Sequence, residues 1–488
     1  MITMDIEKFN SFVKRYRIFQ QFPSVYETIG GFNEFGPYGA TIKANLVNVM
    51  RDVFRQEAFW EVDCPLISPY IVWKASGHAD RFVDIVAESD GKMYRVDKVF
   101  EELYPDEILK EKGVEGLAKL VAERKMIPEK NKEPLKNVQE YNLMMKTSVA
   151  GIDAFLRPET ATTTYLAFAD YFNLFRERMP VMVFQYGRAF RNEIATKHGL
   201  MRGREFEQME SQIFILKDDK KSFPKFKYAK DSEHTFFSEK EQVANAKPVK
   251  MTLEKAVKTG VLGNEAYAYC FYVVLTILQQ LGIDTEKVRY RQHLKDEKAH
   301  YALDAWDIEI FTEAFGWVEA CGVHDRGDYD LSRHQEFSNK NFSIKNGNGE
   351  LEVPHILEIA FGVGRTMYCT LEQSFEERDG KNILKLKRSL TPIQAAVFPL
   401  VKRENLPEVA DSIYNDLRHN NIIAFYDQSG SVGKRYARMD EIGTPFCITV
   451  DFDYNKDKTV TIRDRDTGEQ IRLEPEKLAG YIKEKIHE

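Results

Sequence analysis

Apolar positions follow helical spacing in some segments of the chain and alternate in others. Residues 45–59 place apolar side chains three and four positions apart with charged residues between them, which predicts an amphipathic helix. Residues 60–65 alternate and close at Pro65, which is typical of a strand. Residues 266–278 form the most apolar stretch and predict a buried helix, because a helix that crosses a bilayer needs ~20 apolar residues.

Two polar segments interrupt this pattern. We expect insertions at about 101–140 and 217–265, because both segments are rich in charge and poor in aliphatic residues. Strand patterns return at 288–294, 306–311, 317–321 and 356–360, and the last turns through 361–365 into a helix over 366–375. Strands clustered in this way favour an α+β domain with an antiparallel sheet.

The pattern changes near residues 385–392. Beyond them, strands at 394–400, 422–426 and 446–452 alternate with helical segments, including 406–419. This alternation predicts a small α/β domain with a largely parallel sheet. We therefore divide the chain into a body over 1–388 and a second domain over 389–488.

Composition narrows the function classes. The chain is 43% hydrophobic and 30% charged, which rules out wholesale disorder. Its 69 Lys and Arg against 76 Asp and Glu give a net charge of −7, so any contact with nucleic acid must rest on local basic patches. Five scattered cysteines without a Cys-x-x-Cys pair exclude a disulfide framework and fit a reducing compartment. The polar N-terminus lacks the apolar core of a signal peptide. We expect a cytoplasmic protein without membrane contact.

One charged segment lies in apolar surroundings. The strand-like residues 184–193 end in Arg191 and Glu193, which share a face of a strand, and a second strand-like segment follows at 202–210. A surface hairpin with salt bridges of ~0–1 kcal/mol each is the simple interpretation. However, the flanking apolar runs would be buried, and buried arginines need anionic partners, of which a bound phosphate is one.

Two further charges stand at predicted helix starts. Arg365 follows a glycine pair at the start of the helix, where the helix dipole disfavours a cation unless an anion lies nearby. Glu159 precedes another apolar helix, and alone it indicates no more than a charge that complements the dipole.

Taken together, these segments resemble a class II aminoacyl-tRNA synthetase, and within that class the dimeric archaeal and eukaryotic glycyl-tRNA synthetases. The segments that carry the resemblance are Phe35–Gly39, the strand ending at Pro65 (motif 1), Ala75–His78, Tyr141–Met144, Phe190–Glu193 through Arg204–Phe206 (motif 2), Arg291–His293, His300–Tyr301, Trp306–Asp307, Gly362–Arg365 (motif 3) and Ser431–Gly443 in the anticodon-binding domain. The resemblance covers nearly the whole chain apart from the two insertions, and the order of the segments argues against chance.

The resemblance implies that the protein activates glycine with ATP and transfers it to tRNA(Gly), with no protein nucleophile. Catalysis would then rest on positioning and on stabilising developing charge. Arg191 and Arg365 would be the catalytic residues. Arg191 would hold the α-phosphate and the glycine carboxylate, and Arg365 would stack on adenine opposite Phe206. Glu193 would accept from the adenine amino group.

The resemblance also implies a set of binding residues. The ATP-binding set is Arg191, Asn192, Glu193, Met201, Arg202, Arg204, Phe206, Glu319, Ala320, Gly362, Gly364 and Arg365, and the glycine-binding set is Arg95, Glu159, Phe206, Glu210, Glu358 and Ala360. Mg²⁺ is expected with ATP, held by Glu319 and Glu358. The tRNA anticodon region is expected to contact Lys434, Arg435, Arg438, Asp440 and Glu441. Residues 44–65 are expected to form a homodimer interface.

The sequence departs from the family pattern at two places. The usual Glu-Pro-Ser before motif 3 is Glu358-Ile-Ala360 here, so a hydroxyl expected at the glycine site is missing. The usual Ala-Gln-Gly after the Pro-Glu-Thr run is Ala161-Thr-Thr163. Separately, Cys321-x-x-His324 has no second half, so we expect no zinc and assign both residues ordinary core or turn roles.

Two other functions fit the same fold. One is a non-catalytic, synthetase-like accessory subunit that binds nucleic acid, and the other is a class II ligase for another small amino acid. A retired active site has no need of Arg191 and Arg365 together with Glu193 and Glu319, and all four are present. ATP–pyrophosphate exchange with glycine, alanine and serine separately would distinguish the three functions.

Overall fold

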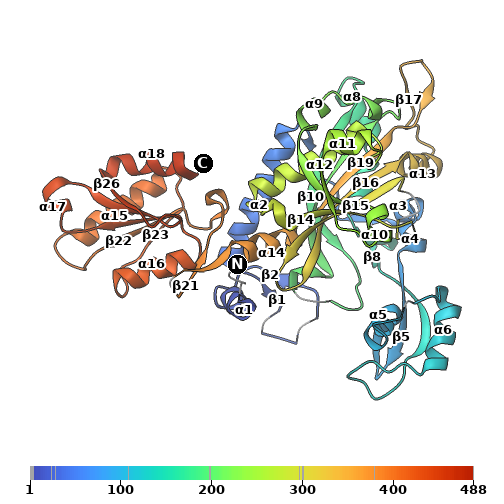
Figure 1. The fold of residues 1–488 in the computed structure, drawn as a ribbon, viewed down its shortest axis with the longest axis horizontal. Helices are drawn as coiled ribbons and strands as arrows, with labels where there is room; N and C mark the ends of the chain where they lie inside the picture. The colour runs from blue at the N-terminus through green and yellow to red at the C-terminus, as the bar shows by residue number, and fades with distance from the viewer. Residues whose placement is uncertain are drawn as a thin grey trace.

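A nine-stranded sheet forms the centre of the larger lobe (Figure 1). The computed structural model describes residues 5–486 except 24, 28, 108, 197–198, 296, 299–301 and 379. In spatial order the strands are Val249–Thr252 (β13), Glu233–Phe237 (β12), Val288–Gln292 (β14), Asp304–Thr312 (β15), Gly316–Gly327 (β16), His355–Gly362 (β19), Glu205–Ile215 (β11), Val181–Phe190 (β10) and Trp60–Glu61 (β3). Neighbours pair antiparallel except β12 with β14 and β10 with β3. The predicted α+β class with an antiparallel sheet is confirmed.

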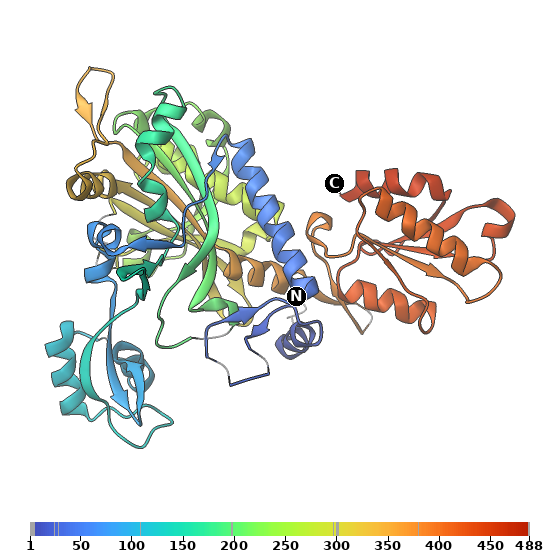
Figure 2. The same ribbon diagram turned by 180° about the vertical axis from the view of Figure 1, so that it is seen from behind.

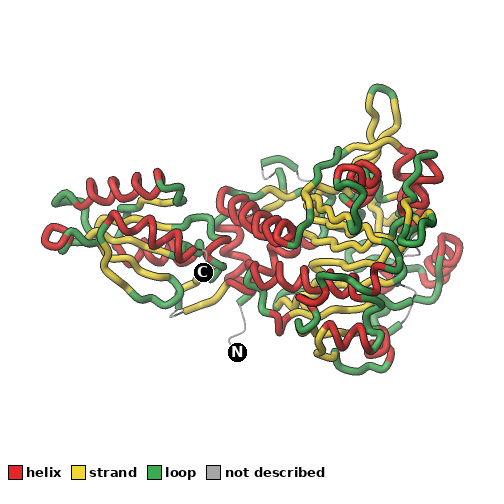
Figure 3. The backbone as a smooth tube through the Cα atoms, turned by 90° about the horizontal axis from the view of Figure 1, so that it is seen from above, coloured by secondary structure: helices red, strands yellow, loops and turns green. Residues whose placement is uncertain are grey.

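Three helices pack against this sheet and against one another. They are Pro37–Gln56 (α2), Glu265–Gln280 (α12) and Val363–Ser374 (α14). α12 is apolar nearly all round and is buried along its length, and its start is fixed by Asn264, whose side chain accepts from the Tyr267 N–H. Seen from above, these helices run alongside the strands, and the C-terminal domain stands apart from them (Figure 3). The helices cover one face of β11, β16 and β19, and side chains on the opposite face shape a cavity.

The segment 217–265 is part of this core rather than an insertion on its surface. It supplies β12 and β13 to the main sheet, and the short helix Phe226–Ala229 (α9) and the helix Leu253–Lys258 (α11) pack against α12. Phe223, Phe226 and Leu253 are buried. The expectation failed because the segment buries widely spaced aromatic residues among lysines, a pattern that a count of aliphatic residues does not register.

The first predicted insertion lies within a small lobe that has its own core (Figure 2). Its three-stranded sheet runs in the order Lys92–Arg95 (β6), Val83–Ser89 (β5) and Lys136–Asn142 (β7). Helices Val96–Leu103 (α5) and Gly113–Arg124 (α6) cover it, burying Phe100, Leu117 and Leu120. The lobe therefore begins earlier in the chain than the charged stretch at 101–140.

A second three-stranded sheet connects this lobe to the main sheet. It consists of Ile67–Pro69 (β4), Ile152–Leu156 (β9) and Met145–Val149 (β8), in that order. Helices Tyr70–Ser76 (α3), His78–Arg81 (α4), Ala161–Tyr165 (α7), Phe168–Leu174 (α8) and Tyr329–Ser338 (α13) lie around it. The chain between β9 and α7 is a short loop, 157–160, which carries Glu159 towards β11.

The C-terminal domain is an α/β layer with a five-stranded sheet. Its order is Ala424–Tyr426 (β23), Ala395–Pro399 (β22), Phe446–Val450 (β24), Val460–Asp464 (β25) and Gln470–Leu473 (β26). The first three strands are parallel, and the last two add an antiparallel edge. Helices Leu406–His419 (α15), Val432–Glu441 (α16) and Pro475–Ile486 (α18) complete the predicted α/β domain.

The N-terminal helix Ile6–Arg15 (α1) lies between the two large units (Figure 1). Phe9 packs edge-on against Tyr368 of α14, with ring centroids 5.6 Å apart. Arg15 pairs with Glu441 of α16 at 2.9 Å, and the Tyr16 hydroxyl donates to the same carboxylate. α1 therefore contacts both the catalytic body and the C-terminal domain. Within the described ranges, we find no helix that is both long enough and apolar enough to cross a membrane.

Candidate active site

A cavity of about 350 Å³ opens over one face of β11, β16 and β19. Its lining includes fourteen of the predicted ATP- and glycine-site residues, namely Glu159, Arg191, Glu193, Met201, Arg202, Phe206, Glu210, Glu319, Ala320, Glu358, Ala360, Gly362, Gly364 and Arg365. Three strands, the first turn of α14 and two loops that are far apart in the sequence therefore converge on one space. Three predicted residues, Arg95, Asn192 and Arg204, do not line it.

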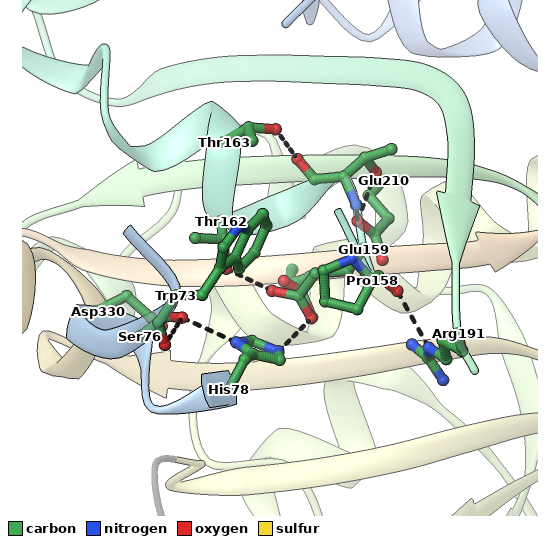
Figure 4. A network of polar contacts seen from close by, with 12 residues as sticks. Trp73, Ser76, His78, Pro158, Glu159, Thr162, Thr163, Arg191, Glu210 and Asp330 are labelled. Carbon is green, nitrogen blue, oxygen red and sulfur yellow. Dashed lines mark hydrogen bonds and ion pairs between the residues drawn. The ribbon is translucent and has the colours of Figure 1, made fainter. Parts of the chain in front are cut away.

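Arg191 stands at one side of the cavity between two aromatic rings. It follows the end of β10, and its guanidinium carbon lies 5.1 Å from the centroid of Phe206 and 5.4 Å from that of Phe82. Its Nε donates to the Pro158 carbonyl at 3.0 Å (Figure 4). Within the described part of the chain, no residue accepts a hydrogen bond from its two terminal nitrogens. The arginine is held in place while its anion-binding fork stays available.

Arg365 occupies the first turn of α14 on the opposite side. Its Nε donates to the Met201 carbonyl at 3.0 Å, and its Nη1 lies 3.0 Å from both the carbonyl and a carboxylate oxygen of Glu319. The anion that a cation at a helix start requires is thus supplied by Glu319, whose side chain is 51% exposed. The planar guanidinium lies along the cavity wall.

Glu193 provides a buried acceptor at the same end. One of its carboxylate oxygens has no hydrogen-bond partner in the described structure, although Arg202 lies 3.9 Å away. Arg204 holds this segment from behind, because its Nε donates to the Glu193 carbonyl at 2.9 Å and its Nη1 to the Gly30 carbonyl at 2.9 Å. An unpartnered buried carboxylate oxygen suits a ligand that carries an N–H donor.

Three buried carboxylates form the other end of the cavity. Glu159 comes from the loop after β9, Glu210 from β11 and Glu358 from β19. Glu210 accepts from the N–H and hydroxyl of Thr160 at 2.9 and 2.5 Å and from the Gln208 amide at 2.9 Å. It lies directly opposite Ala360 across the β11–β19 pairing.

Glu159 and Glu358 each have a hydroxyl donor and a histidine as partners. Glu159 accepts from the Thr162 hydroxyl at 2.6 Å and lies 3.4 Å from Nε2 of His78 (Figure 4). Glu358 accepts from Tyr165 at 2.7 Å, and its other oxygen lies 2.8 Å from Nδ1 of His324.

Arg326 adds a cation to this end of the cavity. Its Nη1 reaches both Glu358 oxygens at 3.3 and 3.4 Å.

The three carboxyl groups have different pKa values. Burial, with the neighbouring Glu358 and Glu159 charges, raises the pKa of Glu210 to about 8. Burial also opposes ionisation of Glu159, but His78 and Arg326 outweigh it and hold that pKa well below its usual range. Arg326 and His324 likewise overcome burial and lower the pKa of Glu358. At neutral pH the pocket holds two carboxylates and one neutral acid, an arrangement that a bound cation would change.

Several predicted roles do not fit this geometry. Arg95 donates two hydrogen bonds to the Asp97 carboxylate, at 3.1 and 2.7 Å, and lies 3.3 Å from Asp84. Its charge is therefore paired within the small lobe. Asn192 donates to the Tyr141 hydroxyl at 2.5 Å, which ties the motif 2 strand to that lobe.

Glu358 does not fit a metal ligand, because three donors engage its carboxylate. His300 and Tyr301 lie outside the described residues.

Sequence reasoning missed His78, Gln208, His324 and Arg326. Cys321 is the expected core residue, but His324 faces the cavity. Alternation along β16 supplies the missing signal, because Gly322, His324 and Arg326 share a face and all three line the cavity. His78 lies in Ala75–His78, a segment that the resemblance marked without a role.

The predicted anticodon residues divide into exposed and engaged groups. Lys434 is exposed, and Arg438 is half-buried, donating to the Ser429 carbonyl at 2.7 Å and pairing with Asp427. Arg435, in contrast, is buried and donates to the Pro399 and Gly430 carbonyls at 2.6 and 2.9 Å.

The two acids are engaged as well. Asp440 is buried against Arg463 at 2.9 and 3.2 Å, and Glu441 holds α1. Arg435, Asp440 and Glu441 are each engaged within the protein, so the structure does not favour their assignment to tRNA, which stays a prediction.

The fold and the site define a class II tRNA synthetase. Residues 149–374 match the family model described as "tRNA synthetase class II core domain (G, H, P, S and T)", and residues 394–485 match the "Anticodon binding domain". A crystal structure of prolyl-tRNA synthetase from Cryptosporidium parvum, complexed with L-proline and AMP, superposes with a TM-score of 0.57 at 14% identity, covering 98% of this chain and 77% of that one. At that identity the likeness shows the fold alone.

Curated relatives narrow the class. Proteins named glycine–tRNA ligase are 34% identical in Methanococcus maripaludis (95% of this chain, 96% of the relative), 33% in Methanocaldococcus jannaschii (99% of both) and 36% in Pyrococcus furiosus (95% of both). The chain belongs to the glycine–tRNA ligase family. The non-catalytic alternative gains no support, because these relatives carry a ligase name and the cavity keeps both arginines.

Proposed function

We propose that this protein activates glycine with ATP and attaches it to the 3′ end of tRNA(Gly), using the cavity over one face of β11, β16 and β19. The observation that carries the proposal is the division of that cavity. Arginines and an aromatic ring occupy one end, and three buried carboxylates occupy the other. The first end suits a nucleotide, and the second suits a small ammonium-bearing substrate.

In the first step a glycine carboxylate oxygen attacks the α-phosphorus of ATP, and pyrophosphate leaves with the bonding electron pair. Arg191 holds the α-phosphate and the carboxylate together, because its fork is free and its stem is fixed by Pro158 and two rings. Charge that develops on the phosphate oxygens is stabilised by a donor already in place.

The adenine base lies between Phe206 and Arg365 in this proposal. The exposed face of each is directed to the same cavity, and stacking of a base on a ring or guanidinium is favourable. The unpartnered Glu193 oxygen accepts from the exocyclic amino group. Met201, Ala320, Gly362 and Gly364 complete the walls, and the two glycines allow close approach of the backbone.

The carboxylate end holds the glycine ammonium. Glu159, Glu210 and Glu358 are together a repulsive cluster that a single positive charge relieves. Alanine is excluded by the walls, since one methyl group in a tolerant apolar site would bind more tightly by ~1–3 kcal/mol.

In the second step the 3′-hydroxyl of the terminal adenosine attacks the glycyl carbonyl carbon, and AMP leaves. No protein nucleophile takes part in either step.

Magnesium fits this site through Glu319 alone. In the part of the chain that the structure describes, no three His, Cys, Asp or Glu side chains gather to hold a metal. Glu319 is half-exposed at the cavity wall, whereas the Glu358 oxygens are taken by other donors. Mg²⁺ commonly binds through one or two carboxylates together with substrate phosphates. When bound with ATP it would neutralise phosphate charge next to Glu319.

The C-terminal domain is the proposed tRNA anticodon contact. Lys434 and Arg438 are the exposed and half-buried cations of α16, and they replace the larger predicted set. With a net charge of −7, such contacts must be local, and their strength should fall with salt as phosphate contacts release counterions.

A homodimer is proposed from the edge of the main sheet. β3 pairs with β10 on one side only, and its Trp60 is 61% exposed. Ile67, Ile71 and Leu174 are exposed on neighbouring elements, with Leu174 at 73%. Exposed apolar side chains beside an open sheet edge suit a self-complementary interface.

We place the protein in the cytoplasm, where its five free cysteines would stay reduced.

The deciding experiment is ATP–pyrophosphate exchange with glycine, alanine and serine offered one at a time. Exchange should depend on glycine and on Mg²⁺. A folded protein with no glycine-dependent exchange would contradict the proposal, and comparable exchange with alanine would contradict the account of the pocket.

A further inference from the structure

We propose that His324 is a specificity-determining residue that accepts a hydrogen bond from the substrate ammonium through Nε2, in place of a hydroxyl at position 360. This inference rests on the proposed function. It concerns a residue whose sequence context indicated only a core or turn role, and which the structure places at the carboxylate end of the cavity.

The register of the strands sets the imidazole beside Ala360. On β16, Gly322 lies directly opposite Ala360, and His324 lies directly opposite Glu358. A Cβ built at Gly322 would lie 2.7 Å from Cε1 and 3.0 Å from Nε2 of His324. The edge of the ring therefore fills the place where a side chain at 322 would stand. Directly opposed side chains in antiparallel strands are ~4.5–5.5 Å apart at Cβ, so the Nε2 edge borders the space next to Ala360.

Glu358 determines which nitrogen of the ring carries the proton. Its Oε1 lies 2.8 Å from Nδ1, and an ionised carboxylate can only accept, so Nδ1 donates. In the neutral ring Nε2 is then an acceptor. No described residue donates to Nε2, and the side chain is 23% exposed, towards the cavity that it lines.

The acceptor capacity of the neighbouring carboxylates favours this role. The Glu358 carboxylate already accepts hydrogen bonds from Tyr165 and His324 and two contacts from Arg326. These donors fill most of its roughly four lone-pair sites. Glu358 supplies negative charge and orients the ring, but offers little room for another donor. An ammonium has three N–H donors, and Glu159, Glu210 and His324 Nε2 supply three acceptors.

The test compares His324→Leu, which keeps the bulk without an acceptor, with His324→Gln, whose amide can donate to Glu358 and still present an oxygen. Loss of one hydrogen bond to a charged group corresponds to a factor of roughly ten or more in affinity. We expect His324→Leu to raise the glycine KM at least about tenfold with the ATP KM unchanged, and His324→Gln to stay within about threefold of wild type. An unchanged glycine KM in folded His324→Leu overturns the inference.

Restoring a hydroxyl provides an independent arm. In the His324→Leu background, Ala360→Ser should recover much of the lost glycine KM, because it returns an acceptor to the same space. A purely space-filling role for the imidazole predicts no recovery, and that result would overturn the inference.

A spectroscopic arm needs no Leu variant and so does not depend on its folding. In wild-type protein labelled with ¹⁵N-histidine, glycine should shift one Nε2 resonance that is missing from His324→Gln, whereas acetate, which lacks the ammonium, should not. A His324 resonance that does not respond to glycine would refute the contact. If wild type shows no glycine-dependent exchange, the proposed function fails first, and this result is distinct from either of the others.

Discussion

Glu210 should make glycine binding steeply dependent on pH. Its pKa is raised to about 8 by burial and by the Glu358 and Glu159 charges, so at neutral pH it is mostly protonated. A glycine ammonium arriving beside it favours the carboxylate, and binding must therefore release close to one proton. The apparent glycine dissociation constant should scale as one plus ten to the power of the pKa minus the pH. With a pKa of about 8, the weakening is about elevenfold at pH 7 and about twofold at pH 8.

Two assays measure this dependence. The glycine KM in ATP–pyrophosphate exchange, followed between about pH 6.5 and 8.5, should fall close to tenfold per unit at the acidic end and level off above the pKa. Calorimetric titration of glycine in buffers of different ionisation enthalpy should report about one proton released at pH 7. The ATP KM is the internal control and should show no such slope. Glu210→Gln, which cannot ionise, should bind glycine more weakly and lose the slope.

The raised pKa of Glu210 also affects the pH dependence of folding stability. A carboxyl whose folded pKa lies above its unfolded value stabilises the folded state at low pH and loses that contribution as the pH rises through the folded pKa. The melting temperature of wild type should therefore fall relative to Glu210→Gln as the pH rises from the ordinary carboxyl pKa of 4.5 towards about 8, and should level off above that. A flat glycine KM profile, or an identical slope in Glu210→Gln, would refute the assignment of Glu210 as the titrating group.

Three further perturbations test other parts of the structure. Arg191→Ala should slow ATP–pyrophosphate exchange ~100-fold or more with an unchanged melting curve, since it removes one preorganised donor; a folded variant with the wild-type rate would contradict the α-phosphate assignment. In the C-terminal domain, Lys434→Glu should weaken tRNA charging without altering glycine activation. Arg435→Ala should instead lower the melting temperature, because the buried Pro399 carbonyl loses its donor at ~1–3 kcal/mol and the Gly430 carbonyl loses a second contact. Equal effects of the two variants on stability would count against this division. Light scattering of wild type should give twice the monomer mass of 56.7 kDa at micromolar concentration, and Trp60→Glu should reduce it; a monomeric wild type would refute the interface.

The elements that depend on local periodicity were predictable. α12 and α15 lie within two residues of their expected bounds, because unbroken apolar or amphipathic spacing determines a helix wherever it packs. The segment 217–265 was not predictable in this way. β12 pairs with β14 and β13 pairs with β12, and single aromatic residues of the segment reach the core.

The candidate site also contains residues that were predictable from the sequence and residues that were not. The arginines and glutamates of motifs 2 and 3 carry a type-specific signal, and the structure brings most of them to one cavity. The sequence carries no such signal for which groups a charged side chain will contact. The sequence predicts that Arg435 is an exposed cation of α16. In the structure its side chain is turned inwards and donates hydrogen bonds to two backbone carbonyls instead of to phosphates. The sequence predicts only a core or turn role for His324, and its register opposite Glu358 reveals its environment.

The N-terminal helix α1 has a consequence for how the molecule measures its substrate. One end of its contacts rests on Tyr368 of the helix that carries Arg365, and the other rests on Glu441 at the end of α16. α1 is thereby one of the contacts that set the distance between the proposed adenylate site and the proposed anticodon surface, together with the contact of Arg465 with the Leu384 carbonyl. Because a fixed distance favours a tRNA whose two ends are spaced to match, we expect α1 to contribute to the choice of tRNA without touching it.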